Sequence, residues 1–141
     1  MPFENKARLR FWRFFIRNEG GQALVEMAIV MTVLLLLLTG IVEFGRIFNA
    51  SLTVVHASRE AARVGILGKT DEEIINAAKS ASGFLDPTKL TISIVPSEGE
   101  RKSGQELTVE VQYPVHIIVP LINHIIPNPF LVSGRTTMRI E

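Results

Sequence analysis

The side chains best suited to catalysis or metal binding are His56, His116 and His124, and the chain has no cysteine. The histidine spacing matches no zinc-ligand pattern, and the lack of thiolates excludes a cysteine-containing metal site. The sequence also lacks the G-x-S-x-G, G-x-x-x-x-G-K-[ST] and G-x-G-x-x-G patterns of hydrolases and nucleotide-binding sites. We therefore predict no catalytic residue, no metal, no cofactor and no small-molecule substrate.

One carboxylate, Glu26, directly precedes the stretch Met27–Val42, which contains no charged residue. As a helix this stretch covers about 24 Å, and extension back to Gln22 gives about 31 Å, enough to cross the ~30 Å hydrocarbon core of a bilayer. A buried core helix is the alternative, but Leu34–Leu38 is apolar around the whole helix circumference. The sequence therefore predicts a membrane-spanning helix that takes Glu26 into the membrane, where a carboxylate needs a partner or a function.

The charges on either side of this helix predict its orientation. Residues 1–21 carry five basic and two acidic side chains, whereas residues 43–141 carry ten basic and eleven acidic ones. The positive-inside rule places such an N-terminus in the cytoplasm and exports the C-terminal part. The net charge of +1 also argues against a nucleic-acid partner. We expect a single-pass protein of the bacterial cytoplasmic (inner) membrane.

The string Gly20-Gly21-Gln22-Ala23-Leu24-Val25-Glu26, between a basic leader and an apolar helix, resembles the class III signal of type IV prepilins. The resemblance implies that a prepilin peptidase cuts between Gly21 and Gln22. The new α-amino group of Gln22 would then be cationic, with Glu26 as its counter-charge within the chain or on a neighbouring subunit, fixing helix register during assembly. The alternative is that Glu26 lies near the lipid headgroups.

A more specific resemblance rests on residues 21–26, on Leu38-Thr-Gly-Ile-Val-Glu-Phe-Gly-Arg46 and on Ala57-Ser-Arg-Glu-Ala-Ala-Arg63. Together they resemble the TadE-like family, pilin-like minor pseudopilins of the tight-adherence (Flp pilus) system. The resemblance implies a prepilin peptidase substrate that supports pilus assembly or secretion and meets other pilin-like subunits and secretion components. Mature Flp-class signals commonly have an aromatic residue after the glutamate, whereas this chain has Met27.

Glu43 and Arg46 follow the apolar stretch and are three residues apart, so they share a helix face and can form an ion pair. We regard them as candidates for an interface outside the membrane. The alternative is an ordinary helix exit at the membrane surface.

The exported part predicts an α+β fold. The spacing of Leu52, Val55, Ala62 and Ile66 indicates that the membrane helix continues outside as an amphipathic helix. A second helix is expected from Asp71 through Lys79 or Ser82, capped by Thr70. Alternation over residues 90–95 and 107–113, with a third candidate over 134–140, predicts a small antiparallel sheet packed on the helices. We expect a leader over residues 1–21, the long helix over 22–66 and a small exported domain over 67–141.

The segment Pro114–Val132 is strongly apolar but contains four prolines, which argues against a regular helix or a central strand. It is either a loop folded over the sheet or an exposed apolar surface for a partner subunit or the outer lipid leaflet.

Two other functions compete with a pseudopilin. One is an uncleaved signal-anchor protein whose exported domain binds a partner or ligand. The other is a membrane-tethered hydrolase, which would need a nucleophile–base pair that the sequence does not show.

Overall fold

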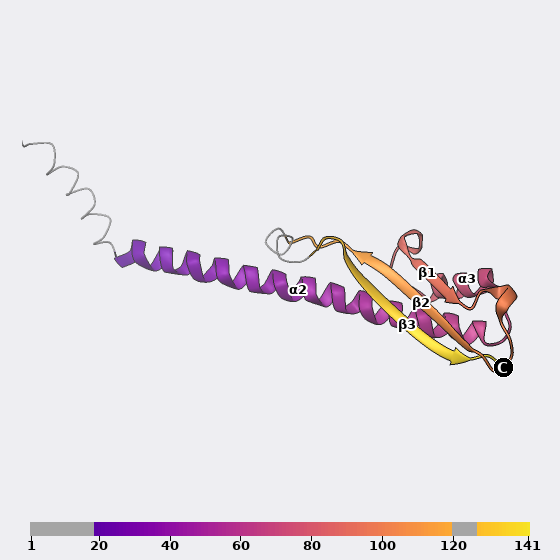
Figure 1. Ribbon diagram of the computed structural model, residues 1–141. Helices are drawn as coiled ribbons and strands as arrows, with labels where there is room; N and C mark the ends of the chain where they lie inside the picture. The colour runs from indigo at the N-terminus through magenta and orange to yellow at the C-terminus, as the bar shows by residue number, and fades with distance from the viewer. Residues whose placement is uncertain (1–18, 120–126) are drawn as a thin grey trace, which may run out of the picture. The chain divides into compact units, whose positions relative to one another are not determined.

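The computed structural model describes residues 19–119 and 127–141 (Figure 1). The leader up to residue 18 and residues 120–126, with His124, lie outside the described residues. The elements are α2 (Glu19–Gly65), α3 (Asp71–Ala81), η1 (Pro87–Lys89), β1 (Thr91–Val95), η2 (Glu98–Glu100), β2 (Glu106–Val115) and β3 (Phe130–Arg139). These elements confirm the predicted α+β class. The chain divides into two compact units, Met1–Ile41 and Val42–Glu141.

The described part of the first unit is entirely helical, and almost all of its side chains from Gln22 onwards are exposed. Its two threonine hydroxyls are satisfied inside the helix, because Thr32 Oγ1 donates to Ala28 O at 2.7 Å and Thr39 Oγ1 donates to Leu35 O at 2.6 Å. Hydroxyls bonded to their own helix backbone can lie in an apolar environment at little cost. Both threonines are therefore compatible with lipid.

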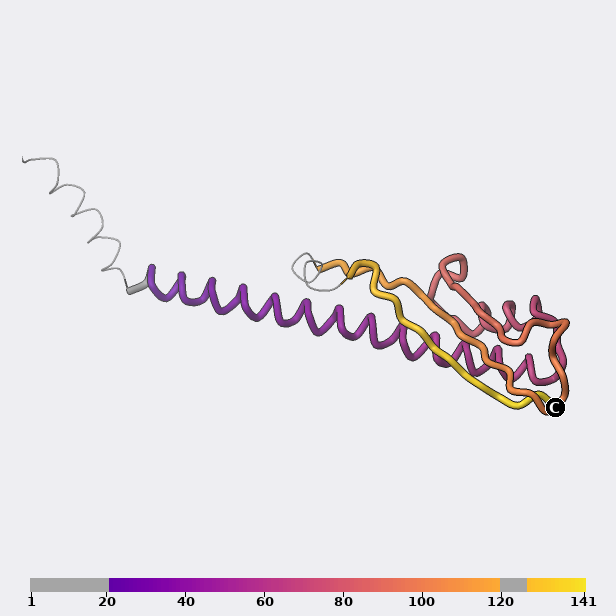
Figure 2. Tube along the Cα trace, viewed as in Figure 1, coloured from indigo at the N-terminus to yellow at the C-terminus, as the bar shows by residue number. Residues whose placement is uncertain are grey.

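The second unit contains a three-stranded antiparallel sheet in the order β1-β2-β3. Figure 2 follows the chain from the end of α2 through α3 into this sheet. The register pairs Ile94 with Val109 and Val111 with Gly134. Alternate residues of β2 are buried, which is the period expected of a sheet with one covered face.

The core of the second unit forms where this sheet packs against the C-terminal part of α2 and against α3. Small side chains on α2 allow the sheet to approach the helix closely, and Ser58 Oγ bonds Thr136 Oγ1 across the contact at 2.8 Å. The core includes Ala50, Val54, Ala57, Ala61, Ile74, Leu107, Val109 and Val111. Of the residues whose spacing predicted an amphipathic helix, Ala62 is buried in this core, whereas Leu52 is 55% exposed. The sheet packs on the alanine-rich face of α2, because alanine side chains are small enough for the sheet backbone to approach the helix.

The proline-rich segment is more regular at its two ends than its composition predicts. Pro114 and Val115 complete β2, where they pair with Leu131 and Phe130 of β3. Strand β1 begins at Thr91, which pairs with Gln112, so the residues of β2 after Gln112 have no partner in β1. A proline here removes no hydrogen bond from a β1 ladder, which is why strand geometry extends to Val115.

Candidate functional site

The first part of the candidate site is the start of α2, where Gly21 and Gln22 both have helical backbone. Glu26 is exposed and forms no hydrogen bond or ion pair with any residue that the structure describes. Gln22 and Glu26 are four positions apart in the helix, which corresponds to a rise of about 6 Å and places them on one face. If Gln22 became the first residue, its amine and the Glu26 carboxylate would lie one turn apart.

The helical backbone at Gly21 bears on access to the Gly21–Gln22 bond. A protease cleft takes an extended segment, so the first turn of α2 would have to open before the bond could be cut. Glycine lowers helix stability by about 1 kcal/mol relative to alanine, and this turn contains two successive glycines. The two glycines therefore lower the stability of the helix next to the Gly21–Gln22 bond.

An uninterrupted apolar surface follows Glu26 in the same helix. The leucines from Leu34 to Leu38 are all more than half exposed, and no charged side chain occurs between Met27 and Val42. Among the described residues, one helix is long and apolar enough to cross a membrane. This helix fits a single-pass membrane protein.

The second part of the candidate site is the pair Glu43 and Arg46, in the second unit. Arg46 Nη1 donates to both carboxylate oxygens of Glu43 at 3.0 Å. The Glu43 side chain is only 5% exposed, whereas that of Arg46 is 42% exposed. The backbone N–H of Ile118 also donates to Glu43 Oε1, at 3.3 Å. Glu43 thus has two partners, one within its own helix and one from the segment after β2.

A side-chain amide holds the two arms of the β2–β3 connection together beside this pair. Ile117 N–H donates to Asn128 Oδ1, and Asn128 Nδ2 donates to Ile117 O, both at 3.2 Å. Glu43 and Arg46 were predicted from the sequence, whereas Ile118 and Asn128 were not. The sequence contains only an indirect indication of these contacts, because a carboxylate next to the apolar stretch needs partners. The partner cannot be identified from the sequence when it is a backbone N–H, since almost every residue has one.

A cavity of about 340 Å³ lies next to Arg46. It is lined by both polar and apolar side chains, those of Arg46, Asn49, Ala50, Phe84, Leu85, Tyr113 and Val115. No group of three or more potential metal ligands occurs among the residues that the structure describes. His56 and His116 are both exposed.

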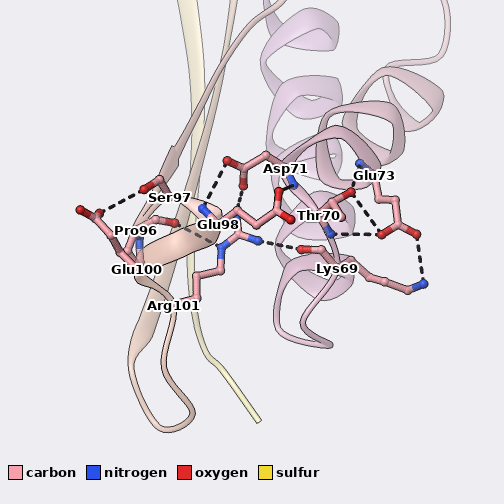
Figure 3. A network of polar contacts seen from close by, with 9 residues as sticks. All are labelled: Lys69, Thr70, Asp71, Glu73, Pro96, Ser97, Glu98, Glu100 and Arg101. Atoms are coloured by element: carbon pink, nitrogen blue, oxygen red, sulfur yellow. Dashed lines mark hydrogen bonds and ion pairs between the residues drawn. The ribbon is translucent and has the colours of Figure 1, made fainter.

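A polar network at the other end of the second unit fastens the β1–β2 loop to the start of α3 (Figure 3). Arg101 forms an ion pair with Asp71 and donates to Lys69 O at 2.7 Å and Pro96 O at 3.2 Å. Glu98 Oε2 accepts from Asp71 N at 3.1 Å, and Asp71 Oδ2 accepts from Glu98 N at 3.4 Å. Burial lowers the pKa of the Arg101 guanidinium. The charged groups of Arg101, Asp71 and Glu98 all bond to neighbouring residues, so the network has a structural role.

The same network contains the cap of α3. Thr70 and Glu73 form a reciprocal capping box, in which Thr70 Oγ1 accepts from Glu73 N and the Glu73 carboxylate accepts from Thr70 N at 3.1 Å. The Thr70 N–H, followed by the Lys69 ammonium, lowers the pKa of Glu73. The predicted cap at Thr70 and the predicted start at Asp71 both agree with α3.

Comparison with known proteins gives one result. The family model described as TadE-like protein matches residues 21–63. No curated protein and no solved structure matches the chain. The matched residues begin at Gly21, continue through Glu26 and the apolar stretch, and include Glu43 and Arg46. The match confirms the resemblance found in the sequence, and it covers residues 21–63, nearly the whole of α2.

Proposed function

We propose that the chain is a TadE-like minor pseudopilin, a non-enzymatic component that supports assembly or secretion of thin Flp-type (tight-adherence) pili. The observation that carries the proposal is the family match, which starts at Gly21 and covers the apolar helix with Glu26. In this proposal the protein lies in the bacterial inner membrane with its N-terminus in the cytoplasm. The unit from Val42 onwards is exported.

The proposed first step is cleavage by a prepilin peptidase between Gly21 and Gln22. Removal of residues 1–21 leaves a cationic amine on Gln22, one helical turn from the Glu26 carboxylate. In a low-dielectric environment, an amine and a carboxylate attract strongly, within one chain or between two adjacent helices. Pairing between subunits would fix the axial register of neighbouring pilin-like helices, which is the role we propose for Glu26.

The proposed second step uses the exported unit. Glu43 and Arg46 stabilise the junction between α2 and the segment after β2 through the bonds described above. Arg46 retains an exposed guanidinium edge beside the 340 Å³ cavity. We propose that this region contacts other pilin-like subunits or secretion components of the tight-adherence system.

The test is the intact mass and N-terminal sequence of the protein extracted from membranes of its native cells. The proposal expects a chain that begins at Gln22 in wild-type cells and at Met1 or Pro2 in cells without the peptidase. Gly21→Leu should block cleavage, whereas Gly20→Leu, the same change one residue earlier, should leave it largely intact.

A full-length chain in cells with an active peptidase would overturn the proposal. The uncleaved signal-anchor protein would then be the better interpretation. Equal processing of Gly20→Leu and Gly21→Leu would place the cut elsewhere, which would also contradict the role assigned to Gly21.

A further inference from the structure

Exposed apolar side chains gather at the end of the second unit that adjoins the apolar stretch of α2. Ile118 and Phe44 are each 69% exposed, and Leu131 is 62% exposed. Phe44 stacks on Phe48, one helical turn further on, with ring centroids 6.3 Å apart. Exposed apolar patches of this kind usually mark contact with a partner or a membrane. We infer that this end of the unit, formed by Phe44, Phe48, Ile118 and Leu131, lies in the outer surface of the lipid bilayer.

Contacts within the second unit give the level of each residue along α2. The Ile118 N–H bonds Glu43, the first residue after the apolar stretch. Gly134, which pairs with Val111, lies against the backbone of Val54. Leu107, at the start of β2, lies against Gly65 at the end of α2. The chain from Leu107 to Ile118 therefore runs alongside about 33 Å of helix, with Ile118 at the level of Glu43.

The charge distribution follows this axis. From Pro114 to Gly134 the sequence has no Asp, Glu, Lys or Arg. The loop at the opposite end of β2, residues 96–105, contains two glutamates, an arginine and a lysine. An end that faces lipid must avoid unpaired charge, whereas an end in water does not. The end of the sheet near Pro114 thus has the uncharged sequence expected next to lipid, and the end near residues 96–105 has the charged sequence expected in water.

Glu43 is the one carboxylate at the lipid-facing end, and it is not exposed there. Its side chain is 5% exposed and is paired with Arg46 and the Ile118 N–H. Arg46 lies one turn further along α2, and its side chain is 42% exposed. An arginine at that level can reach lipid phosphates while its methylene groups remain in apolar surroundings.

Continuity with the apolar stretch favours lipid over a protein partner as the occupant. Phe44 lies two residues after Val42 in the same helix, so a bilayer that surrounds Met27–Val42 ends within about 3 Å of Phe44 along the axis. The helix backbone and the Glu43–Ile118 bond then bring Ile118 to the same level. The inference requires α2 to span the membrane but does not require cleavage after Gly21.

The lack of cysteine allows a direct measurement of depth. Single-cysteine variants Ile118→Cys, Leu131→Cys and Val95→Cys of the full chain would carry a nitroxide label in phosphatidylcholine–phosphatidylglycerol vesicles. Collision with oxygen, which concentrates in lipid, is compared with collision with a water-soluble nickel chelate. Val95 is the matched control, because it is 61% exposed but lies at the opposite end of the sheet, where it pairs with Thr108.

The oxygen-to-nickel ratio is expected to be several-fold higher at residue 118 than at residue 95, with residue 131 between them. Ile118→Cys changes an exposed side chain and keeps the backbone N–H that bonds Glu43, so the fold should be retained. Leu36→Cys provides a reference inside the apolar stretch. Lipid exposure at residue 36 with water exposure at residue 118 would overturn the inference and leave the membrane span intact. Low collision with both reagents at residue 118 would indicate a protein contact and would also overturn it.

Discussion

Gly134 of β3 lies directly against the backbone of Val54 in α2: a Cβ on Gly134 would come within 2.6 Å of the Val54 carbonyl carbon and oxygen. Backbone atoms cannot rotate away as the end of a side chain can. This contact sets the closest distance between the sheet and the helix, and it explains why a glycine occupies the middle of a strand.

We expect Gly134→Ala to destabilise the second unit by about 1–3 kcal/mol, because the added methyl group must push the strand off the helix. For a unit of this size that corresponds to a fall in Tm of roughly 4–8 °C per kcal/mol. Thermal unfolding in detergent micelles, followed by circular dichroism, measures it. Gly99→Ala is the control, since nothing lies within 4 Å of its Cβ position. Equal Tm values for the two variants would contradict the close contact.

We expect Glu43→Ala to destabilise the second unit by about 1–3 kcal/mol, because it leaves the Ile118 N–H and Arg46 without an acceptor. The amide of Ile118 should also exchange its hydrogen faster. Glu60→Ala is the matched control: Glu60 forms an i,i+3 ion pair with Arg63 that is far more exposed, and such pairs contribute only about 0–1 kcal/mol. Similar losses in both variants would show that the burial of Glu43 has no energetic consequence.

The capping box predicts an acid-sensitive part of the stability. The folded-state pKa of Glu73 is lowered by the Thr70 N–H and by Lys69, so the unfolded state binds more protons in acid. This contribution is present above the ordinary Glu pKa of 4.5 and is lost as the pH falls through the lower folded-state value. Glu73→Gln keeps the cap geometry without titrating, so its Tm should fall less between about pH 6 and pH 3. Glu72→Gln, one residue earlier, should follow the wild type.

The role proposed for Glu26 predicts that cleavage and assembly can be separated. Glu26→Gln removes the counter-charge for the Gln22 amine and leaves Gly21 unchanged. We expect a normally processed chain and a strong loss of surface pili, measured by mass spectrometry and by electron microscopy of the cells. Thr32→Val is the control, because its hydroxyl bonds its own helix. Normal piliation in Glu26→Gln cells would contradict the proposal that Glu26 fixes the register of neighbouring helices.

Local patterns predicted the elements of the fold well. The apolar run predicted α2, the Thr70 cap predicted the start of α3, and the alternating residues predicted β1 and β2. Each of these patterns depends only on residues that are close in sequence. Of the four apolar positions that predicted the continuation of α2, Ala62 is buried, Val55 and Ile66 are half-buried, and Leu52 is exposed because the sheet packs on the alanines.

The candidate site was only partly predictable for a related reason. The spacing of Glu43 and Arg46 allowed their ion pair, which the structure contains. The bond from Ile118 joins residues 75 positions apart and uses a backbone N–H, which every residue except proline carries. The assignments of Gly21, Gln22 and Glu26 rest on resemblance and remain predictions.

The Asn128 amide meets Ile117 as a peptide group of a neighbouring strand would, with one donor and one acceptor. These two side-chain bonds therefore continue the β2–β3 ladder beyond its last pair, Val115–Phe130. The ten residue pairs from Glu106–Arg139 to Val115–Phe130 fix the register of the two strands. This end of the strand pair therefore depends on the identity of one side chain, Asn128, whereas the ladder itself depends on backbone groups that every residue except proline carries in full.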